Sequence, residues 1–338
     1  AKAFDMATPM CGIYTIGGTD PDFTNFADAA IALNNAGLTC PVIFEIRDGI
    51  YDEQIKLYEI SGSSATNTIT FRGESRDSSL VELHYTTSNP SNDFTLAITG
   101  SDYISFEDMS IMRTNGSNSV LIQNESNHVR FERCRFTGHV LSPNTSVDEY
   151  LTFRDIAMAG YDLNLQQVIS ESSRDIVVER VIMQDLTVSN SENVIVTLSQ
   201  GRRFHFISDT TLSINDNQIS YHYTGWIERF RGVYLSKCSH AALQNNDVIN
   251  ITASQPRAIE LNDSKSISLL SNNITCGGTY SWSMGIFLNG VESENIILRE
   301  NTITSQGNVH RHGIYADNGD SVYIANNTLR SIDHAAYG

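Results

Sequence analysis

The C-terminal part of the chain repeats a pattern of paired apolar residues every 26 to 28 positions. Each repeat contains two such pairs, and the two members of a pair are separated by one residue. The first pairs are Val233/Leu235, Ile259/Leu261, Ile286/Leu288 and Ile314/Ala316, and the second pairs are Ala241/Leu243, Ile267/Leu269, Ile296/Leu298 and Val322/Ile324. Short alternating segments that recur at a period of roughly 20–50 residues are typical of a solenoid built from strands.

An asparagine stands at a fixed position in every repeat, five residues beyond the first member of the second pair, and an aliphatic residue follows it. The four are Asn246, Asn272, Asn301 and Asn327. Asparagine tolerates the left-handed backbone of a tight turn, and its amide can bond to its own copy one repeat away. We therefore predict an all-β, right-handed parallel β-helix of about ten coils, with the asparagines in one line about 4.8 Å apart.

The length and charge of the chain bound its organisation and its partners. The chain has 338 residues and a formal net charge of −17. Since a solenoid core can lengthen without limit, we expect one elongated domain, with residues 1–41 as an N-terminal strand and capping helix and residues 42–338 as the β-helix. The charge disfavours nucleic acid and anionic membranes, and no transmembrane segment or signal peptide is recognised.

The chain stops in the middle of its own pattern. Residues 334–338 align with residues 312–316, where an earlier strand begins. We therefore expect the β-helix to continue beyond residue 338, as part of a longer surface protein.

The first 37 residues have the features of a lid. Residues 12–18 predict a strand and turn, and residues 24–35 predict a helix with Phe26, Ala30 and Leu33 on one face. Thr24 is the expected N-cap and Gly37 the expected terminator. A stack of coils needs such a lid because its open end is apolar.

The segment that follows resembles a known superfamily. Four segments resemble the N-terminal portion of the pectin-lyase-like β-helix superfamily. They are residues 42–46, the turn at 47–49, the run Tyr51-Asp52-Glu53 and residues 67–73. More closely, residues 12–18, 21–23, 49–54 and 65–71 are similar to the opening of large β-helix repeat proteins exported to the surface of Bacteroidetes-type bacteria. The resemblance covers about the first quarter of the chain. It implies a β-helix and an extracellular or cell-surface location, and it implies no single activity.

The middle coils follow the same pattern with other residues at the asparagine corner, namely Met109, Cys134, Ile156 and Val181. We expect first strands at 96–98, 120–122, 168–169 and 194–196. We expect second-strand pairs at Ile104/Phe106, Val129/Phe131, Leu151/Phe153, Ile176/Val178 and then Phe204/Phe206. Two excursions from the stack are expected, at 138–149 and 208–230, the longer containing Trp226 and two tyrosines. Such an insertion lies beside a functional face or is a featureless bulge.

The outward face of the first strands is the candidate binding surface, because the interior of a β-helix is a filled core. The residue between the members of each first pair points outward, which gives the column Leu121, Ile195, Tyr234, Glu260, Phe287, Tyr315 and Tyr337. Three residues earlier stand Arg231, Arg257, Met284, His312 and His334, and two residues later stand Ser236, Asn262, Asn289 and Asp317. Aromatic rings beside Arg, His and carboxylates suit a sugar polymer. The alternative is that another part of the chain covers this stripe.

From this surface we predict a glycan-binding site. Its residues are Arg231, Tyr234, Arg257, Glu260, Phe287, His312, Tyr315 and Asp317. No catalytic residue is assigned, since the paired aspartates of pectin methylesterases and the motifs of polygalacturonases are missing. A lyase needs a base and a cation beside the uronate, and Arg257, His312, Tyr315 or the nearby Lys237 have the required chemistry.

No cofactor is expected, and the cysteines give little sign of a metal. His310 and His312 lack an identifiable third ligand, so zinc is disfavoured. Asp317, Asn318 and Asp320 suit either calcium or an ordinary turn. The five cysteines include no Cys-x-x-Cys; Cys134 is expected as a buried apolar residue, and Cys11 and Cys40 form a disulfide only if the compartment is oxidising.

Three functions therefore compete. The chain is a secreted or surface-displayed β-helix that binds extended glycans or mediates adhesion, a polysaccharide lyase or related enzyme that uses the same face, or a structural stalk.

Overall fold

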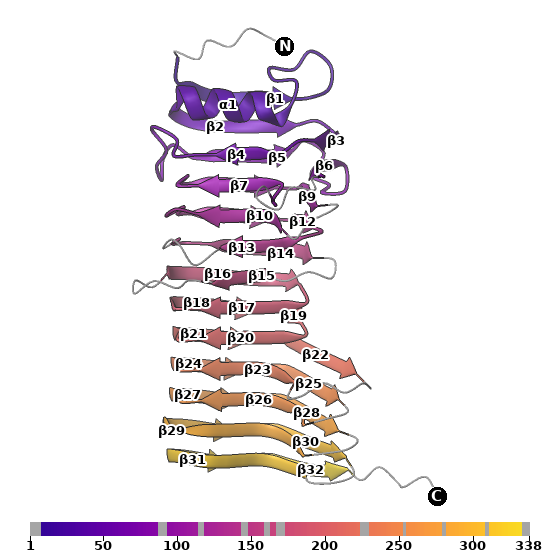
Figure 1. The fold of residues 1–338 in the computed structure, drawn as a ribbon, viewed down its shortest axis with the longest axis vertical. Helices are drawn as coiled ribbons and strands as arrows, with labels where there is room; N and C mark the ends of the chain where they lie inside the picture. Colours follow the sequence, from indigo (N-terminus) through magenta and orange to yellow (C-terminus); the bar gives the residue numbers. More distant parts are fainter. Residues whose placement is uncertain are drawn as a thin grey trace, which may run out of the picture. The chain divides into compact units, whose positions relative to one another are not determined.

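The computed structural model describes residues 8–86, 93–113, 118–142, 148–158, 163–166, 173–223, 230–252, 255–278, 282–307 and 311–332. They fall into two compact units, residues 1–183 (unit 1) and residues 184–338 (unit 2). Strands pair in parallel throughout both units, and the chain is a parallel β-helix of about ten coils with one short helix, as the repeats predicted (Figure 1).

Unit 1 contains the helix and the first coils. Its elements are β1 (Met10–Ile16), α1 (Phe26–Ala36), β2 (Leu38–Ile46), β3 (Gly49–Asp52), β4 (Ile55–Leu57), β5 (Ile69–Gly73), β6 (Val81–Tyr85), β7 (Leu96–Thr99), β8 (Ile104–Glu107), β9 (Ser110–Arg113), β10 (Asn118–Gln123), β11 (Val129–Glu132), β12 (Arg135–Phe136), β13 (His139–Ser142), β14 (Thr152–Met158), β15 (Leu163–Gln166) and β16 (Ser173–Ile182). Three rows of strands recur from coil to coil. The row that contains β5, β8, β11 and β14 is in register at every step.

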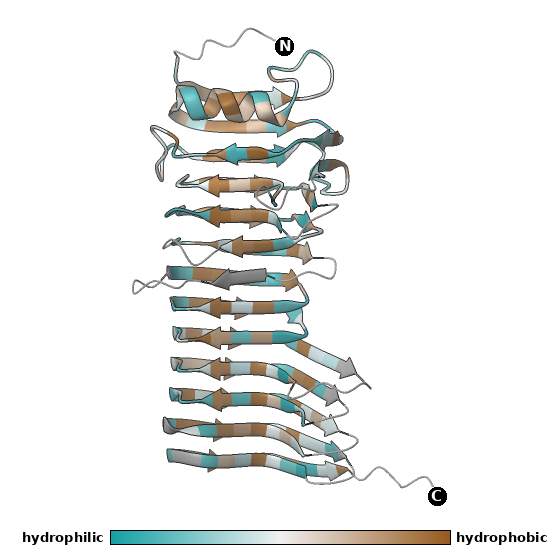
Figure 2. Cartoon of the chain, viewed as in Figure 1, coloured by the Kyte–Doolittle hydropathy of each residue, from teal (hydrophilic) through white to brown (hydrophobic). Residues whose placement is uncertain are grey.

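Stacked phenylalanines fill the interior of unit 1. The rings of Phe44, Phe71, Phe106, Phe131 and Phe153 follow one another, with centroid separations of 4.5, 5.2, 5.3 and 5.7 Å. All five are buried, which stabilises the fold by roughly 1.5–3 kcal/mol for each ring. The alternation in each strand causes this order, because every second residue points inward. Figure 2 shows the apolar segments recurring among polar ones in the strands.

Helix α1 packs against β4 and β1, and Figure 1 shows it at the N-terminal end of unit 1. Phe26, Ala30 and Leu33 are buried, as predicted. The N-cap is Asn25 rather than the predicted Thr24, because the Asn25 side chain accepts a hydrogen bond from the Asp28 amide at 2.7 Å. Gly37 ends the helix with φ of 65°, and its amide donates to the Leu33 carbonyl.

The run Tyr51-Asp52-Glu53 has a structural role at this helix. The Glu53 carboxylate accepts hydrogen bonds from the amides of Phe26 at 3.1 Å and Ala27 at 2.7 Å, so it binds the positive end of the helix dipole. The Tyr51 hydroxyl donates to the Arg47 carbonyl at 2.9 Å. A Cβ at Gly17, where φ is +74°, would collide with that hydroxyl, so glycine is required there.

Unit 2 is built from three rows of strands. Its elements are β17 (Asp185–Ser189), β18 (Ser191–Thr197), β19 (Gln200–Gly201), β20 (Arg203–Ile207), β21 (Thr210–Asn215), β22 (Gln218–Tyr223), β23 (Arg231–Ser236), β24 (Ser239–Gln244), β25 (Asp247–Thr252), β26 (Arg257–Asn262), β27 (Lys265–Leu270), β28 (Asn273–Gly278), β29 (Ser283–Arg299), β30 (Thr302–Gly307), β31 (Arg311–Ala325) and β32 (Thr328–Ile332). The first row is β17, β20, β23, β26 and the starts of β29 and β31. The second row is β18, β21, β24, β27 and the ends of β29 and β31.

The predicted line of asparagines is present in unit 2. The amide of Asn246 donates to Asn272 at 2.9 Å, Asn272 donates to Asn301 at 2.9 Å, and Asn301 donates to Asn327 at 2.9 Å. Asn217 adds one member upstream and donates to Asn246 at 3.0 Å. Each amide also donates to a backbone carbonyl of the previous coil.

The backbone conformation at this corner differs from the prediction. The left-handed residue is the one before each asparagine, and these are Asp216, Asn245, Ser271, Glu300 and Asn326, with φ between 55° and 59°. The asparagine of the line serves as a hydrogen-bonding side chain. In unit 1 the equivalent residues Met109, Cys134, Ile156 and Val181 are buried and apolar.

Several boundaries in the middle of the chain were predicted wrongly. Residues 194–196 belong to β18, which pairs with β21 in the second row, so they are not a first strand. Phe204 and Phe206 lie in β20 of the first row, opposite Val233 and Leu235. Residues 208–230 are not one excursion, since β21 and β22 occupy most of them, and β13 likewise occupies part of 138–149. Residues 168–169 and Trp226 lie outside the described residues.

The five cysteines form one disulfide and three buried thiols. Cys11 in β1 and Cys40 in β2 form a disulfide across paired strands. Cys134, Cys238 and Cys276 are buried thiols, and burial raises the pKa of each to about 12. In the described part of the chain, no helix has the length and apolar character of a membrane span.

Candidate functional site

The first row of strands in unit 2 brings the predicted site residues together. The register from β23 to β31 aligns three outward columns, whose members were all predicted (Figure 1). The basic column is Arg231, Arg257, Met284 and His312; the central column is Tyr234, Glu260, Phe287 and Tyr315; and the amide column is Ser236, Asn262, Asn289 and Asp317.

Two other predicted members of the central column lie elsewhere. Ile195 is in the second row, opposite Ser213, so it does not belong to this face. Leu121 lies in β10 of unit 1. His334 and Tyr337 are outside the described residues.

Glu260 holds two arginines at the centre of the face. Its carboxylate contacts Nε of Arg231 at 2.5 Å and Nη1 of Arg257 at 2.8 Å, and its side chain is only 3% exposed. Two guanidinium groups against one carboxylate leave one positive charge without compensation. Glu260 therefore orients the arginines, and it is too enclosed to bind a ligand directly.

The arginines lie over the aromatic rings. The guanidinium of Arg231 is 4.4 Å from the ring centre of Tyr234, and that of Arg257 is 3.9 Å from the ring centre of Phe287. Phe287 is 6% exposed. The expected open stripe of rings is therefore interrupted, because the long side chain of Arg257 covers one of them.

Histidine and tyrosine side chains form the C-terminal end of the face. The rings of Phe287 and Tyr315 stack at 5.5 Å, and the imidazole of His312 meets Tyr315 edge-on at 5.2 Å. Trp282 lies 5.7 Å from His312. Tyr315 and His312 are half-buried, so they offer accessible edges where Phe287 does not.

The polar columns include groups without partners. Among the described residues, Nε of Arg257 and Nε2 of His312 are buried and have no hydrogen-bond partner. In the amide column, Asn289 donates to Asn262 at 2.9 Å, and Asp317 is exposed at the end. Asp317 and Asp320 both lie in β31 rather than in the turn that was expected.

The residues proposed for lyase chemistry are only partly together. His312 and Tyr315 are in contact, whereas Arg257 belongs to a strand two coils away and is engaged by Glu260. Lys237 is exposed in the corner after β23, in a left-handed conformation.

The face extends to residues that the sequence reasoning did not assign. His205 lies opposite Tyr234, and their rings meet at 5.6 Å. Asp185 pairs with Arg202 at 3.2 Å and with Arg203. A first pair at Phe204/Phe206 would have aligned His205 with Tyr234, and Arg202 with Arg231, at an offset of 29 residues, one more than the longest of the later repeats.

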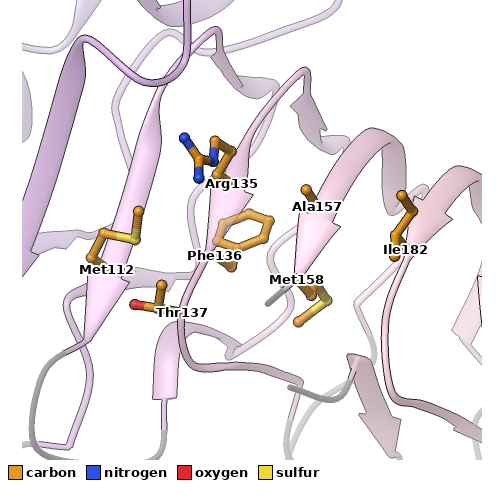
Figure 3. Close-up of a pocket in the computed structure, with 7 residues that line it drawn as sticks. All are labelled: Met112, Arg135, Phe136, Thr137, Ala157, Met158 and Ile182. Atoms are coloured by element: carbon orange, nitrogen blue, oxygen red, sulfur yellow. The ribbon is translucent and has the colours of Figure 1, made fainter. Parts of the chain in front are cut away.

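Unit 1 has a separate, mainly apolar hollow of about 140 Å³ on its third row of strands (Figure 3). Met112, Arg135, Phe136, Thr137, Ala157, Met158 and Ile182 line it. Its only ionisable group is Arg135, so it contains no acid–base set.

Comparison with known proteins identifies the fold. Residues 168–331 match the family model of the right-handed β-helix region. A search among curated protein sequences found no match. The parallel coils described above agree with this match.

Similar solved structures are distant in sequence. Tailspike protein 3 of bacteriophage CBA120 is 14% identical over 92% of this chain, with a TM-score of 0.43, and this chain spans 61% of its length. The catalytic domain of a GH87 α-1,3-glucanase, solved with tetrasaccharides, is 9% identical over 99% of this chain and 70% of its own, with a TM-score of 0.49. A GH136 lacto-N-biosidase from Eubacterium ramulus is 8% identical over 95% and 68%, with a TM-score of 0.46.

Proposed function

We propose that this right-handed β-helix binds extended glycans along the outward face of β23, β26, β29 and β31. The carrying observation is the register, which places Arg231, Arg257 and His312 in one column beside Tyr234 and Tyr315. Neighbouring strands lie about 4.8 Å apart, so the columns follow the coil axis and suit a polymer that runs along it.

The charges on this face favour an acidic glycan. Arg231 and Arg257 share one enclosed carboxylate, and the side chain of Arg231 is 28% exposed. The chain as a whole has a net charge of −17, so a local positive excess is not a consequence of composition. Guanidinium groups bind carboxylates and sulfates by charged hydrogen bonds, which supports polymers that contain uronic acids or sulfated sugars.

The proposed place of action is outside the cytoplasm. The Cys11–Cys40 disulfide supports an oxidising compartment, because such bonds are rare where thiols are kept reduced. A secreted or surface-displayed protein that binds acidic glycans would mediate adhesion, and this is the biological role that we propose.

The binding face is tested by comparing two tyrosines of the same strand. Tyr315 lies on the proposed face, whereas Tyr323 of β31 lies in the second row and is 59% exposed. We expect Tyr315→Ala to weaken binding of acidic oligosaccharides by roughly 1–3 kcal/mol, and Tyr323→Ala to leave it unchanged. Titration calorimetry against galacturonate, glucuronate and sulfated oligomers measures both variants.

The arginines are tested in the same assay. Arg231→Ala should weaken binding of acidic oligomers, and the deficit relative to wild type should shrink as salt rises. Arg299→Ala is the matched control, since Arg299 pairs with Glu300 in the second row. Equal binding by all four variants would contradict the proposal and would favour the structural stalk.

A lyase is the second candidate, and the contact between the half-buried rings of His312 and Tyr315 favours it. In a lyase, one of these two side chains removes the proton next to the uronate carboxylate. The ultraviolet absorbance of unsaturated products, followed in the same samples, distinguishes the enzyme from the binding protein. Product formation that is lost in His312→Gln would establish the lyase.

A further inference from the structure

A second hollow lies on the outer surface of unit 1, and it shares no residue with the proposed glycan face. Its volume is about 220 Å³, and it is lined by Thr68, Tyr103, Ser105, His128, Arg130, Tyr150 and Thr152. Ser105, Arg130 and Thr152 form one outward column on β8, β11 and β14. They make the floor of the hollow.

A stack of three rings forms one wall. Tyr103, His128 and Tyr150 come from successive coils, and the neighbouring ring centres are 4.2 Å apart with interplanar angles of 14° and 5°. The ring faces are turned toward one another, so the stack offers its polar edges: two phenol hydroxyls and an imidazole.

Most polar side chains of this hollow have no partner among the described residues. Within the described part of the chain, the side chains of Thr68, Ser105 and Thr152 make no hydrogen bond, and neither do the phenol hydroxyls nor the imidazole of the stack. Arg130 pairs with Glu132 through one amino group, but its Nε is buried and has no partner. Hydroxyl and N–H groups that face one cavity with free capacity are what a ligand rich in hydroxyls requires.

The surrounding charges disfavour an anion here. Burial lowers the pKa of His128, although the carboxylates of Asp102, Glu149 and Asp175 act in the opposite direction. Arg130 shares Glu132 with Arg133, and Arg174 pairs with Glu149. The carboxylates of Asp102, Glu132, Glu149 and Asp175 outnumber these three guanidinium groups, so the surroundings carry no net positive charge for an acidic group.

We propose that this hollow binds a neutral oligosaccharide, separately from the acidic-glycan face of unit 2. The lining residues come from four successive coils, so the site is about 14 Å long, which is three strand spacings, and the sugar chain runs parallel to the coil axis. Hydroxyls of the sugar exchange hydrogen bonds with Ser105, Thr152 and the ring edges, and the exposed part of the Arg130 guanidinium, whose side chain is 40% exposed, donates to a sugar oxygen.

The test uses isosteric removal of one floor hydroxyl in the full chain. Thr152→Val keeps the shape of the side chain, and Thr70→Val is the matched control, because Thr70 precedes Ser105 in the same column but does not line the hollow. Calorimetry is performed with neutral tetrasaccharides of glucose, mannose and galactose, and with tetragalacturonate. We expect at least one neutral tetrasaccharide to bind saturably, with an affinity reduced about fivefold in Thr152→Val and unchanged in Thr70→Val.

Two further variants keep the outcome specific. Arg130→Met should weaken binding of the same neutral ligand, whereas Tyr315→Ala should leave that binding unchanged. The two proposals can therefore fail independently of each other. The inference is overturned if no neutral tetrasaccharide binds, if Thr152→Val and Thr70→Val bind equally well, or if only tetragalacturonate is affected by Thr152→Val.

Discussion

His205 and Asp209 are two buried ionisable residues of unit 2, and burial shifts the pKa of each so that its neutral form is favoured. Burial lowers the pKa of His205 from 6.5 to about 4, and the charge of Arg203 adds to this. Burial raises the pKa of Asp209 from 3.8 to about 7, although the amides of Ser191 and Ile207 donate to its carboxylate at 2.7 and 2.8 Å. Both groups are therefore mainly neutral in the folded protein near pH 5.

These two residues are predicted to give opposite dependences of stability on pH. For His205 the folded state binds fewer protons than the unfolded state, so stability is lost as pH falls from 6.5 toward 4. For Asp209 the folded state binds more protons, so stability is lost as pH rises from 4 toward 7. As pH rises from 4 toward 7, the melting temperature of His205→Gln relative to wild type should fall. Over the same rise in pH, the melting temperature of Asp209→Asn relative to wild type should increase. The full effect is roughly 3 kcal/mol for His205 and roughly 4 kcal/mol for Asp209. A pH dependence of the melting temperature that is the same in both variants as in wild type would contradict the assignment.

A second residue-scale prediction concerns buried charge in unit 1. Asp108 is 1% exposed and receives two hydrogen bonds from Arg133, at 2.6 and 3.1 Å. Arg180 binds Asp155 with the same geometry, at 2.5 and 2.9 Å, but that carboxylate is 35% exposed. Arg133→Ala should lower the free energy of unfolding by on the order of 2 kcal/mol, because Asp108 keeps only the more distant Arg76. Urea titration should show a much smaller loss for Arg180→Ala, whose partner water can solvate.

At the scale of elements, the corners of unit 2 depend on the line of asparagines. Each side chain joins two coils, since it accepts from one neighbour and donates to the other and to a backbone carbonyl. Buried amides are costly when unpaired, so the line also fixes the register between strands.

We predict that position in this line decides the cost of removing an asparagine. Asn272 is 1% exposed and bonded on both sides, whereas Asn327 is half-buried and is the last member among the described residues. Asn272→Ala should cost at least about 2 kcal/mol, because each unpaired buried group costs roughly 1–3 kcal/mol. Asn327→Ala should cost less. Urea unfolding followed by circular dichroism compares the two, and equal losses would show that the interior bonds add nothing to stability.

At the scale of the whole molecule, a stack of coils is stable only if its apolar ends are covered. Helix α1 places Phe26, Ala29, Ala30 and Leu33 in the buried interior at the N-terminal end of unit 1. Glu53 caps the helix, and the Cys11–Cys40 disulfide ties β1 to β2.

Deletion of residues 1–37 should therefore make the protein aggregate. The truncation exposes the apolar end of the core and the edge of β2, both of which favour association. Cys40→Ser is included so that a free thiol does not cause the aggregation, and deletion of residues 1–7 is the control. Size-exclusion chromatography and light scattering measure the result; a folded, soluble monomer from the long deletion would refute the capping role.

The sequence by itself determined the fold class, the columns of the candidate face and the line of asparagines. A β-helix is nearly one-dimensional, so a constant offset in sequence becomes direct stacking in space, and period-two alternation decides which side points inward. This is why Arg231, Arg257 and His312 were aligned correctly.

The same rule, applied to Leu212/Ile214, places Asn217 five residues on and would have extended the line. It was missed because residues 208–230 were expected to leave the stack, and because many corners of the described chain use left-handed Arg, His, Tyr and Lys residues, which carry no turn signal in the sequence. For the same reason residues 194–196 and Phe204 were assigned to the wrong rows.

Only the tertiary structure decided what the candidate face presents. Arg257 lies over Phe287 and is held by Glu260, so a ring predicted to be open is buried and a carboxylate predicted to bind is enclosed. The hollow lined by Arg130 and by the stack of Tyr103, His128 and Tyr150 is likewise a feature that only the structure revealed. The rotamer of a long side chain depends on neighbours that are roughly 20 to 30 residues away in sequence, and the repeat period carries no information about that rotamer.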